Sequence, residues 1–350
     1  MNSTIVAGFS ELVKKLTIEL TNSKREKNPS SKLLSIKLNA TRRALQIIKD
    51  FPDQITNGEQ LAPIKGIGPK FIKKMNEMIE SGSISEAKSD TSSNEGQENY
   101  ENVKALIRIT GIGPVKAQKL VDDGITLDTL LTAYNSKDKE LLETLTHHQL
   151  LGVKHFHDLE KRIPRSEITE IKGFLEAMLK SINNDLSFII LGSYRREVVT
   201  SGDIDILVYH KGIHTLEQAE STTYLAEFKE ILIQHRFLVD HLTMKGTTKY
   251  MGFGKYCDNP VRRIDIRFIA LESLGAAMLY FTGSGEFNKN MRTFALKNGY
   301  TINEYGIYKL KSDRKTKDYI VSTETEEDIF KVLGLKYIEP PARTRYVKFQ

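Results

Sequence analysis

The chain has 350 residues, a net charge of +6 from 51 Lys+Arg against 45 Asp+Glu, and a sequence pI near 9.0. This length predicts two or three domains, and 39% hydrophobic with 27% charged residues excludes wholesale disorder. One cysteine excludes a disulfide framework and a cysteine-rich zinc site. Because no apolar run approaches the ~20 residues of a membrane span and no signal-peptide pattern opens the sequence, we expect an intracellular protein, nuclear or cytoplasmic, that is neither secreted nor membrane-bound.

The charge is unevenly distributed. Residues 1–85 carry 14 Lys+Arg against 8 Asp+Glu, a net of +6. Residues 86–102 carry one lysine against five acids, a net of −4, and the remaining residues sum to +4. This pattern predicts a basic domain, an acidic flexible linker and a larger body, with an anionic polymer as partner.

The basic domain is predicted to be helical over residues 9–20 and 33–51, where apolar side chains recur at helical spacing. A glycine turn follows at Ile64-Lys-Gly-Ile-Gly-Pro-Lys70, and it recurs 45 residues later at Ile109-Thr-Gly-Ile-Gly-Pro-Val115. Each turn places a proline at a first helical position. Two copies indicate a helix–hairpin–helix repeat that binds DNA phosphates without reading bases. The alternative is a pair of structural helical hairpins. The glycines assigned to DNA binding are Gly66, Gly68, Gly111 and Gly113.

In the second half of the chain, the spacing of apolar residues changes from helical to strand-like. Residues 188–191, 204–209 and 264–269 are apolar or alternating and predict strands, while residues 223–235 and 274–281 are amphipathic. The expected fold of this part is α+β, built on a sheet.

Three aspartates mark the predicted chemistry. Asp203 and Asp205 are two residues apart at a strand, and Asp265 follows on a later strand between Arg263 and Arg267. Carboxylates on one face of a sheet repel each other unless divalent cations lie among them, and two such ions can hold a phosphoryl group in transfer. Taken alone, an Asp-x-Asp pattern would indicate two aspartates on the solvent-exposed face of a strand. With Gly192-Ser193 and two arginines upstream as a triphosphate site, the pattern favours a nucleotidyltransferase.

These segments resemble the X family of DNA polymerases. Further matches include Lys245–Gly252, Leu279-Tyr-Phe-Thr-Gly-Ser284 and Phe287-Asn-Lys-Asn-Met-Arg292, and the resemblance runs from about Leu33 to about Pro341. It implies an N-terminal all-helical lyase domain followed by a polymerase domain with a helical thumb, a mixed β-sheet nucleotidyltransferase palm and α+β fingers. The expected boundaries are 1–85 for the lyase-like domain, 86–102 for the linker, 103–160 for the second helix–hairpin–helix subdomain, 161–270 for the palm, 271–341 for nucleotide selection and 342–350 for a basic tail.

The resemblance also implies roles for single residues. Asp203 and Asp205 would bind two Mg²⁺ ions, with Mn²⁺ as an alternative, and Asp265 would bind one of them and accept the primer 3′-hydroxyl proton. The nucleotide-binding set would be Ser193, Arg196, Gly202, Arg162, Tyr280, Phe281, Gly283 and Asn288. The palm and template-side DNA contacts would be Lys249, Arg267, Lys289, Arg292 and Tyr305. The backbone carbonyls that bind a monovalent cation, Na⁺ or K⁺, at the two turns would belong to Ile64, Ile67, Ile107, Ile109 and Ile112.

The sequence departs from the family pattern at five places. Glu197 stands where a glycine is usual, and Gly285 stands where an aspartate is usual beside the nucleotide base. Thr41 and Ile36 replace two polar residues of the lyase pocket, and no lysine matches a phosphate-binding one after Gly82.

Lyase chemistry is expected at Lys74. On a helical projection this lysine lies at the edge of an apolar arc, beside Phe71 and Met78. A nucleophilic lysine must be neutral, which partial burial favours. The resemblance makes Lys74 the Schiff-base nucleophile and assigns 5′-phosphate binding to Lys37 with support from Lys70; the alternative is a lysine that only binds DNA.

The predicted function is a template-directed polymerase that fills short gaps in base excision repair, with 5′-deoxyribose-phosphate lyase activity. Its expected partners are gapped or nicked DNA and deoxynucleoside triphosphates, and the expected state is a monomer. The alternatives are a template-independent or end-joining nucleotidyltransferase, a polymerase whose N-terminal domain only binds DNA, and a DNA-end-binding scaffold without chemistry.

Overall fold

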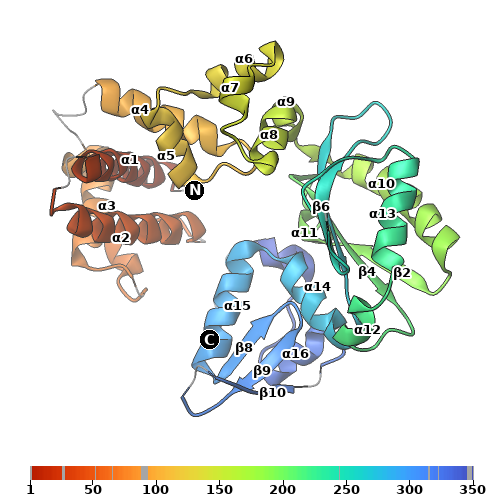
Figure 1. Cartoon of the computed structure of the whole chain (residues 1–350). Coiled ribbons are helices and arrows are strands. Elements are labelled where there is room, and N and C mark those ends of the chain that lie inside the picture. Colours follow the sequence, from red (N-terminus) through yellow and green to blue (C-terminus); the bar gives the residue numbers. More distant parts are fainter. Residues whose placement is uncertain are drawn as a thin grey trace. The chain divides into compact units, whose positions relative to one another are not determined.

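The computed structural model describes residues 2–25, 28–51, 53–64, 66–87, 94–243, 245–313, 316–321, 323–344 and 349. The chain divides into two compact units, Met1–Val153 and Lys154–Gln350, shown from red to yellow and from green to blue in Figure 1. No helix among the described residues has the length and apolar character that crossing a membrane requires.

The first unit begins with the predicted helical domain. It contains helices α1 (Ser3–Arg25), α2 (Ser31–Asp50) and α3 (Pro69–Ser81). The short 3₁₀ helix η1 (Gly58–Leu61) lies between α2 and α3, and a second one, η2 (Ser85–Ala87), follows α3. Helix α3 starts at Pro69 and ends at Gly82, whose φ of 70° is the left-handed conformation that glycine adopts without strain. The three helices pack around a core that includes Phe9, Ile48 and Met75. The predicted helices are confirmed.

The rest of this unit is also helical: α4 (Asn94–Ile107), α5 (Pro114–Asp122), α6 (Leu127–Ser136), α7 (Lys139–Leu142) and α8 (His147–Lys154, which reaches the second unit). Residues 88–93 of the expected linker lie outside the described residues. Residues 94–102 form the first turns of α4, so the expectation of a flexible linker over the whole of 86–102 is wrong there. The reason is that Tyr100 and the apolar residues after it continue a helical pattern into the acidic stretch.

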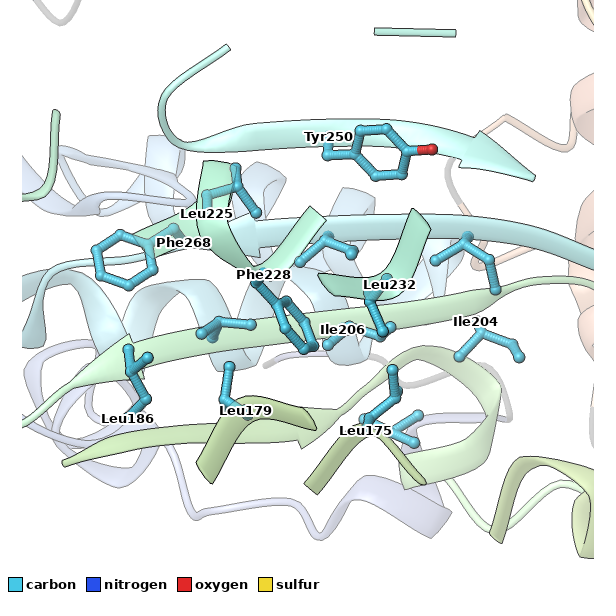
Figure 2. Packing of buried hydrophobic residues seen from close by; sticks show 14 of the residues in the cluster. Leu175, Leu179, Leu186, Ile204, Ile206, Leu225, Phe228, Leu232, Tyr250 and Phe268 are labelled. Atoms are coloured by element: carbon cyan, nitrogen blue, oxygen red, sulfur yellow. The ribbon is translucent and has the colours of Figure 1, made fainter. Parts of the chain in front are cut away.

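The second unit is built on a mixed five-stranded sheet. Its order is β2 (Leu186–Ile190), β4 (Ile204–His210), β7 (Arg262–Phe268), β6 (Lys249–Gly254) and β5 (Leu238–His241). Strands β4 and β7 are parallel and all other neighbours are antiparallel. Helices α10 (Arg165–Ile182) and α13 (Tyr224–Gln234) cover one face, where their Leu179 and Phe228 pack with Ile206 (Figure 2). The α+β expectation and the three predicted strands are confirmed.

The opposite face of this sheet stays partly open and carries polar side chains. Helix α14 (Leu274–Thr282) covers part of it, through Ala277 packed with Leu191 and Leu207. Helices α15 (Gly285–Lys297) and α16 (Glu326–Val332) then form a small α+β layer with the antiparallel strands β8 (Tyr300–Asn303), β9 (Gly306–Leu310) and β10 (Lys317–Val321) (Figure 1). The remaining short elements are α9 (Phe156–Leu159), β1 (Ile163–Pro164), α11 (Gly192–Arg195), β3 (Thr200–Ser201), α12 (Leu216–Glu220), η3 (Leu271–Ser273) and η4 (Pro340–Thr344).

A buried ionic network joins this layer to the palm-like sheet. The Glu326 carboxylate accepts hydrogen bonds from Arg195 at 2.9 and 2.5 Å and from Arg343 at 2.6 Å. Burial opposes ionisation of Glu326, but the two guanidinium groups outweigh it and lower its pKa. Arg343 is fully buried, and its guanidinium lies over the rings of Phe287, Phe330 and Tyr337. The start of the expected basic tail is therefore part of the folded core, not a solvated extension.

Candidate active site and DNA-binding turns

Two of the three predicted aspartates lie side by side on the open face of the sheet. Asp205 and Asp265 are register partners on the parallel strands β4 and β7. In β7 the odd-numbered residues from Arg263 to Arg267 are half-buried and the even-numbered ones are buried, which confirms the predicted alternation. Asp203 lies in a bend just before β4, whereas the prediction had placed it on the strand itself.

The three carboxylates interact strongly. Burial, with the charges of Asp203 and Asp265, raises the pKa of Asp205 to about 7. Desolvation by the surrounding protein, together with the charge of Asp265, also raises the pKa of Asp203, although part of its surface remains accessible to solvent. Like charges held this close disfavour ionisation unless cations lie among them.

Arginine holds the third carboxylate. Arg263, two residues before Asp265 on the same face of β7, donates to its Oδ1 at 2.7 Å. Among the described residues, no group of three or more acidic, histidine or cysteine side chains is arranged closely enough to hold a metal ion. In this structure Asp265 is thus paired with Arg263.

The donor set nevertheless fits divalent cations. Asp205 and Asp265 share one face of the sheet, burial and the charges of the neighbouring carboxylates raise the pKa values of Asp203 and Asp205, and carboxylate oxygens are hard ligands that suit Mg²⁺ or Mn²⁺. The three aspartates are thus of the ligand type that such ions prefer, and their binding of metal stays a prediction.

The start of α11 lies close to Asp205. Gly192 has a φ of 56°, and a Cβ atom built on it would lie 2.2 Å from the Asp205 Oδ2. Any side chain here would displace the carboxylate, so glycine is required for close approach. The next residue, Ser193, donates from its hydroxyl to Ser201 at 2.8 Å.

Arg196 and Arg162 border the same carboxylates. Arg196 donates to the Thr282 carbonyl oxygen at 2.5 Å, while its Nε is buried without a hydrogen-bond partner. Both arginines act electrostatically on Asp203. Arg162 donates to the Thr200 carbonyl at 2.7 Å, and Gly202 leaves room for its guanidinium. A half-buried guanidinium beside these carboxylates is suited to bind an anion at this edge of the site.

The predicted nucleotide-contacting residues of the C-terminal layer also come together. Asn288 donates to the Tyr280 carbonyl oxygen at 2.6 Å, and the two residues line one small cavity with Arg292. Phe281 packs edge to face on Tyr280 and lies under the Arg267 guanidinium at 5.3 Å. Gly283, with a φ of 68°, lies beside Arg196.

The expected DNA contacts fall into two groups. Lys249 is the register partner of Arg267, so both share the face of the sheet that carries Asp265. By contrast, Lys289 and Arg292 are exposed on α15, and Tyr305 lies in the turn between β8 and β9. The structure thus places Lys249 and Arg267 on the sheet face that carries Asp265, and it places the other three residues on the C-terminal layer.

Glu197 occupies a backbone conformation that favours glycine, because its φ is 60°. Replacing Glu197 by glycine should relieve this strain. We expect a net gain of about 0.5–1 kcal/mol, because the strain relief exceeds the entropy that glycine adds to the unfolded chain. Differential scanning calorimetry should show a rise in Tm of roughly 1–4 °C.

The matched control is Glu197→Ala, which removes the same charge but keeps the strained φ. An equal rise in Tm for both variants would show that charge, not backbone conformation, limits stability at this position.

The two glycine turns of the first unit have the same geometry. Gly66 and Gly111 have φ values of 108° and 90°, and the next helices start at Pro69 and Pro114. In each turn the isoleucine two residues before the glycine accepts one backbone hydrogen bond, Ile64 from Ile67 and Ile109 from Ile112. The helix–hairpin–helix repeat is confirmed as a structure; its DNA contacts and cation-binding carbonyls stay predictions.

The lysines assigned to lyase chemistry lie on one side of the first domain. The Lys74 side chain is only 16% exposed and its ammonium lies 5.8 Å from the Phe71 ring centre, as the helical projection predicted. Lys74 and Lys37 both contact Glu86, while Lys70 is exposed to solvent. Thr41 is buried and hydrogen-bonded to the Lys37 carbonyl, and Ile36 is exposed.

Four interactions were missing from the sequence-based predictions. The Glu326 network and the buried Arg262–Glu167 pair, at 2.7 Å, join segments far apart in the chain, so no local pattern signalled them. The Arg263–Asp265 pair could have been inferred from two opposite charges at i and i+2 on one strand face. The role of Glu86 had no signal beyond its negative charge after Gly82.

Comparisons with known proteins agree with this geometry. Family models match for the DNA polymerase beta palm over residues 162–270, the DNA polymerase beta thumb over 277–344, the fingers domain of DNA polymerase lambda over 104–160 and a helix-hairpin-helix domain over 2–84. The chain belongs to the X family of DNA polymerases. The models use thumb and fingers in the opposite sense from our expectation, since they give the name fingers to the first helical segment and thumb to the C-terminal one.

Similar curated proteins include DNA polymerase lambda of Rattus norvegicus, 28% identical, DNA polymerase lambda of Arabidopsis thaliana, 27% identical, and DNA-directed DNA/RNA polymerase mu of Homo sapiens, 25% identical. Each alignment covers 86% of this chain, which spans 51%, 56% and 63% of the length of these relatives. The sequence motifs also suggest DNA polymerase beta as a near relative, and two of the family models carry that name.

Proposed function

We propose that this X-family protein is a template-directed DNA polymerase that fills short gaps during repair, acting on gapped or nicked DNA and deoxynucleoside triphosphates inside the cell. The observation that supports it most is the register pairing of Asp205 with Asp265 beside Arg196. This arrangement joins a cation-binding face to an anion-binding edge, as nucleotidyl transfer requires.

The residues have distinct roles in the proposal. Asp203 and Asp205 hold two divalent cations, and Asp265 holds one of them and accepts the primer 3′-hydroxyl proton. When bound, Mg²⁺ or Mn²⁺ supplies Lewis-acid stabilisation of the attacking and leaving oxygens. Arg196, Ser193 and Arg162 bind the triphosphate at the edge that Gly192 and Gly202 keep open.

The C-terminal layer selects the nucleotide in this proposal. Tyr280 and Phe281 pack against the sugar, Gly283 leaves space beside it, and Asn288 contacts the base edge. Lys289, Arg292 and Tyr305 line the template, while Lys249 and Arg267 bind DNA in the palm. The domain boundaries given above, and the monomeric state, belong to the same proposal.

A template requirement separates this function from template-independent transfer. With Mg²⁺ and one-nucleotide-gapped DNA, we expect incorporation of the complementary nucleotide. The same primer without a templating base should be extended at least about a hundredfold more slowly, because the base edge at Asn288 then lacks its pairing partner. Gel-based single-turnover extension measures both rates, and equal rates would favour the template-independent alternative.

The helix–hairpin–helix turns are proposed to bind phosphates, with a monovalent cation held by carbonyls of Ile64, Ile67, Ile107, Ile109 and Ile112. DNA affinity should then fall steeply as salt rises, because phosphate neutralisation releases counterions. Replacing Lys70, at the start of α3, by alanine should reduce the log–log slope by about one.

The control for this prediction is Lys180→Ala, which removes a surface lysine paired with Glu176 on α10. A flat salt dependence, or an equal change of slope in both variants, would contradict the proposed binding mode.

Lyase activity is proposed at Lys74, which is the most buried of the lysines assigned to this chemistry and lies against an aromatic ring. A polymerase whose first domain only binds DNA is the second candidate, favoured by the Glu86 contact that already occupies Lys74 and Lys37.

A further inference from the structure

Three lysines from three helices converge on a single residue, Glu86 of η2. Lys74 of α3 lies 2.8 Å from its Oε2, and Lys37 of α2 is paired with its Oε1. Lys15 of α1 donates to the backbone carbonyl oxygen of Glu86 at 2.9 Å. No role was assigned to Lys15 from the sequence, and Glu86 lies in the stretch where a phosphate-binding lysine was missing.

The carboxylate is firmly held in this cluster. The Glu86 side chain is 33% exposed, against 16% for Lys74 and 22% for Lys15. Burial opposes ionisation of Glu86, but hydrogen bonds and charges from Lys37 and Lys74 outweigh it and lower its pKa. The carboxylate therefore stays charged at neutral pH and acts as the anion of a cationic pocket.

The cluster carries more positive charge than this anion balances. The single negative charge of the carboxylate is shared by Lys37 and Lys74, one at each oxygen, while Lys15 donates to the backbone carbonyl. Its nearest acid is Glu19 at 3.8 Å. A terminal phosphate carries close to two charges and three acceptor oxygens, so it can engage all three ammonium groups.

Only the Glu86 side chain needs to move for such an exchange. The backbone around it is anchored, because the Ser85 amide donates to Glu77 at 2.7 Å and the Ala87 amide donates to the Ile84 carbonyl at 2.9 Å. Rotation of a half-exposed side chain leaves η2 in place.

We propose that Glu86 is a built-in competitor for a DNA 5′-phosphate, and that Lys15 is a third phosphate-binding lysine beside Lys37 and Lys74. The 5′-phosphate enters by displacing the carboxylate, and Lys74 is released from its ion pair when the end is bound. This inference rests on the proposed 5′-phosphate pocket of the lyase site.

The test compares DNA ends. Fluorescence anisotropy gives the Kd of the full chain for one-nucleotide-gapped DNA with a 5′-phosphate or a 5′-hydroxyl on the downstream strand. In Glu86→Gln the ratio of the two Kd values should shift toward the phosphate by about three- to tenfold, because two competing ion pairs are lost. Glu80→Gln is the matched control, since Glu80 is an exposed acid on α3 with the same charge change.

Lys15 is tested in the Glu86→Gln background. Lys15→Met should remove much of the gained preference for phosphate, whereas Lys14→Met should not, because Lys14 contacts Glu101 instead. Glu86→Ala repeats the measurement if the glutamine variant is unfolded by circular dichroism.

The outcomes separate this inference from the function on which it rests. If Lys37→Ala lowers the wild-type preference for phosphate but Glu86→Gln and Glu86→Ala change it no more than Glu80→Gln, the competitor role of Glu86 is overturned and the pocket stands. If Lys37→Ala has no effect either, the 5′-phosphate pocket itself is wrong. Because binding is measured, neither result depends on lyase chemistry.

Discussion

Replacing Asp265 by alanine is expected to reduce nucleotide incorporation by roughly a thousandfold or more while gapped DNA still binds. The change removes the proposed proton acceptor and one metal-binding carboxylate, and it leaves Arg196 and the phosphate-binding turns untouched. It also frees Arg263, which adds positive charge beside the DNA and should keep or slightly tighten binding. Single-turnover extension and anisotropy measure the two properties separately.

The matched control is Asp258→Ala, which removes an exposed carboxylate from the loop between β6 and β7. This variant should incorporate nucleotide at the wild-type rate. If Asp265→Ala incorporates nucleotide at a rate within about threefold of wild type, the assignment of the aspartate site is wrong, whatever the family resemblance suggests.

Lys74→Ala is expected to abolish covalent trapping on a 5′-deoxyribose-phosphate end. In the proposed reaction the neutral Lys74 amine attacks the sugar aldehyde and water leaves as the Schiff base forms; β-elimination then breaks the bond to the 3′-phosphate, and borohydride reduces any Schiff base present. In the structure the Lys74 side chain is mostly buried, lies 5.8 Å from the Phe71 ring centre and is paired with Glu86. Denaturing gels after borohydride treatment show the adduct.

Lys73→Ala is the control, because Lys73 lies on the same helix but is exposed. It should trap as well as wild type. Adduct formation by Lys74→Ala at the wild-type level would exclude Lys74 as nucleophile, and the absence of an adduct with wild type would favour a first domain that only binds DNA.

The gap between local pattern and tertiary arrangement is clearest around Asp265. The alternation of β7 is local, so its polar face could be predicted from Arg263 to Arg267. That β4 lies next to β7 in parallel register is a long-range choice, since two helices and two other strands separate them in the chain. The raised pKa of Asp205, to which Asp265 contributes, depends on that choice.

The first unit shows the same division. The glycine turns were readable because a positive φ followed by a proline-started helix is determined within seven residues, twice. The partial burial of Lys74 was readable from one helical projection. The Glu86 cluster was not, because Lys15, Lys37 and Lys74 come from helices whose packing alone brings them to η2.

The sequence by itself determined the local parts of this protein: the paired glycine turns, the apolar and acidic alternation of the strands, and the X-family resemblance. Only the tertiary structure decided which charges meet, including Glu326 with Arg195 and Arg343 in a buried network. The physical reason is range. Backbone conformation and amphipathic pattern are set by neighbours a few residues apart, whereas ion pairs between distant segments arise only when packing has fixed the relative positions of helices and strands.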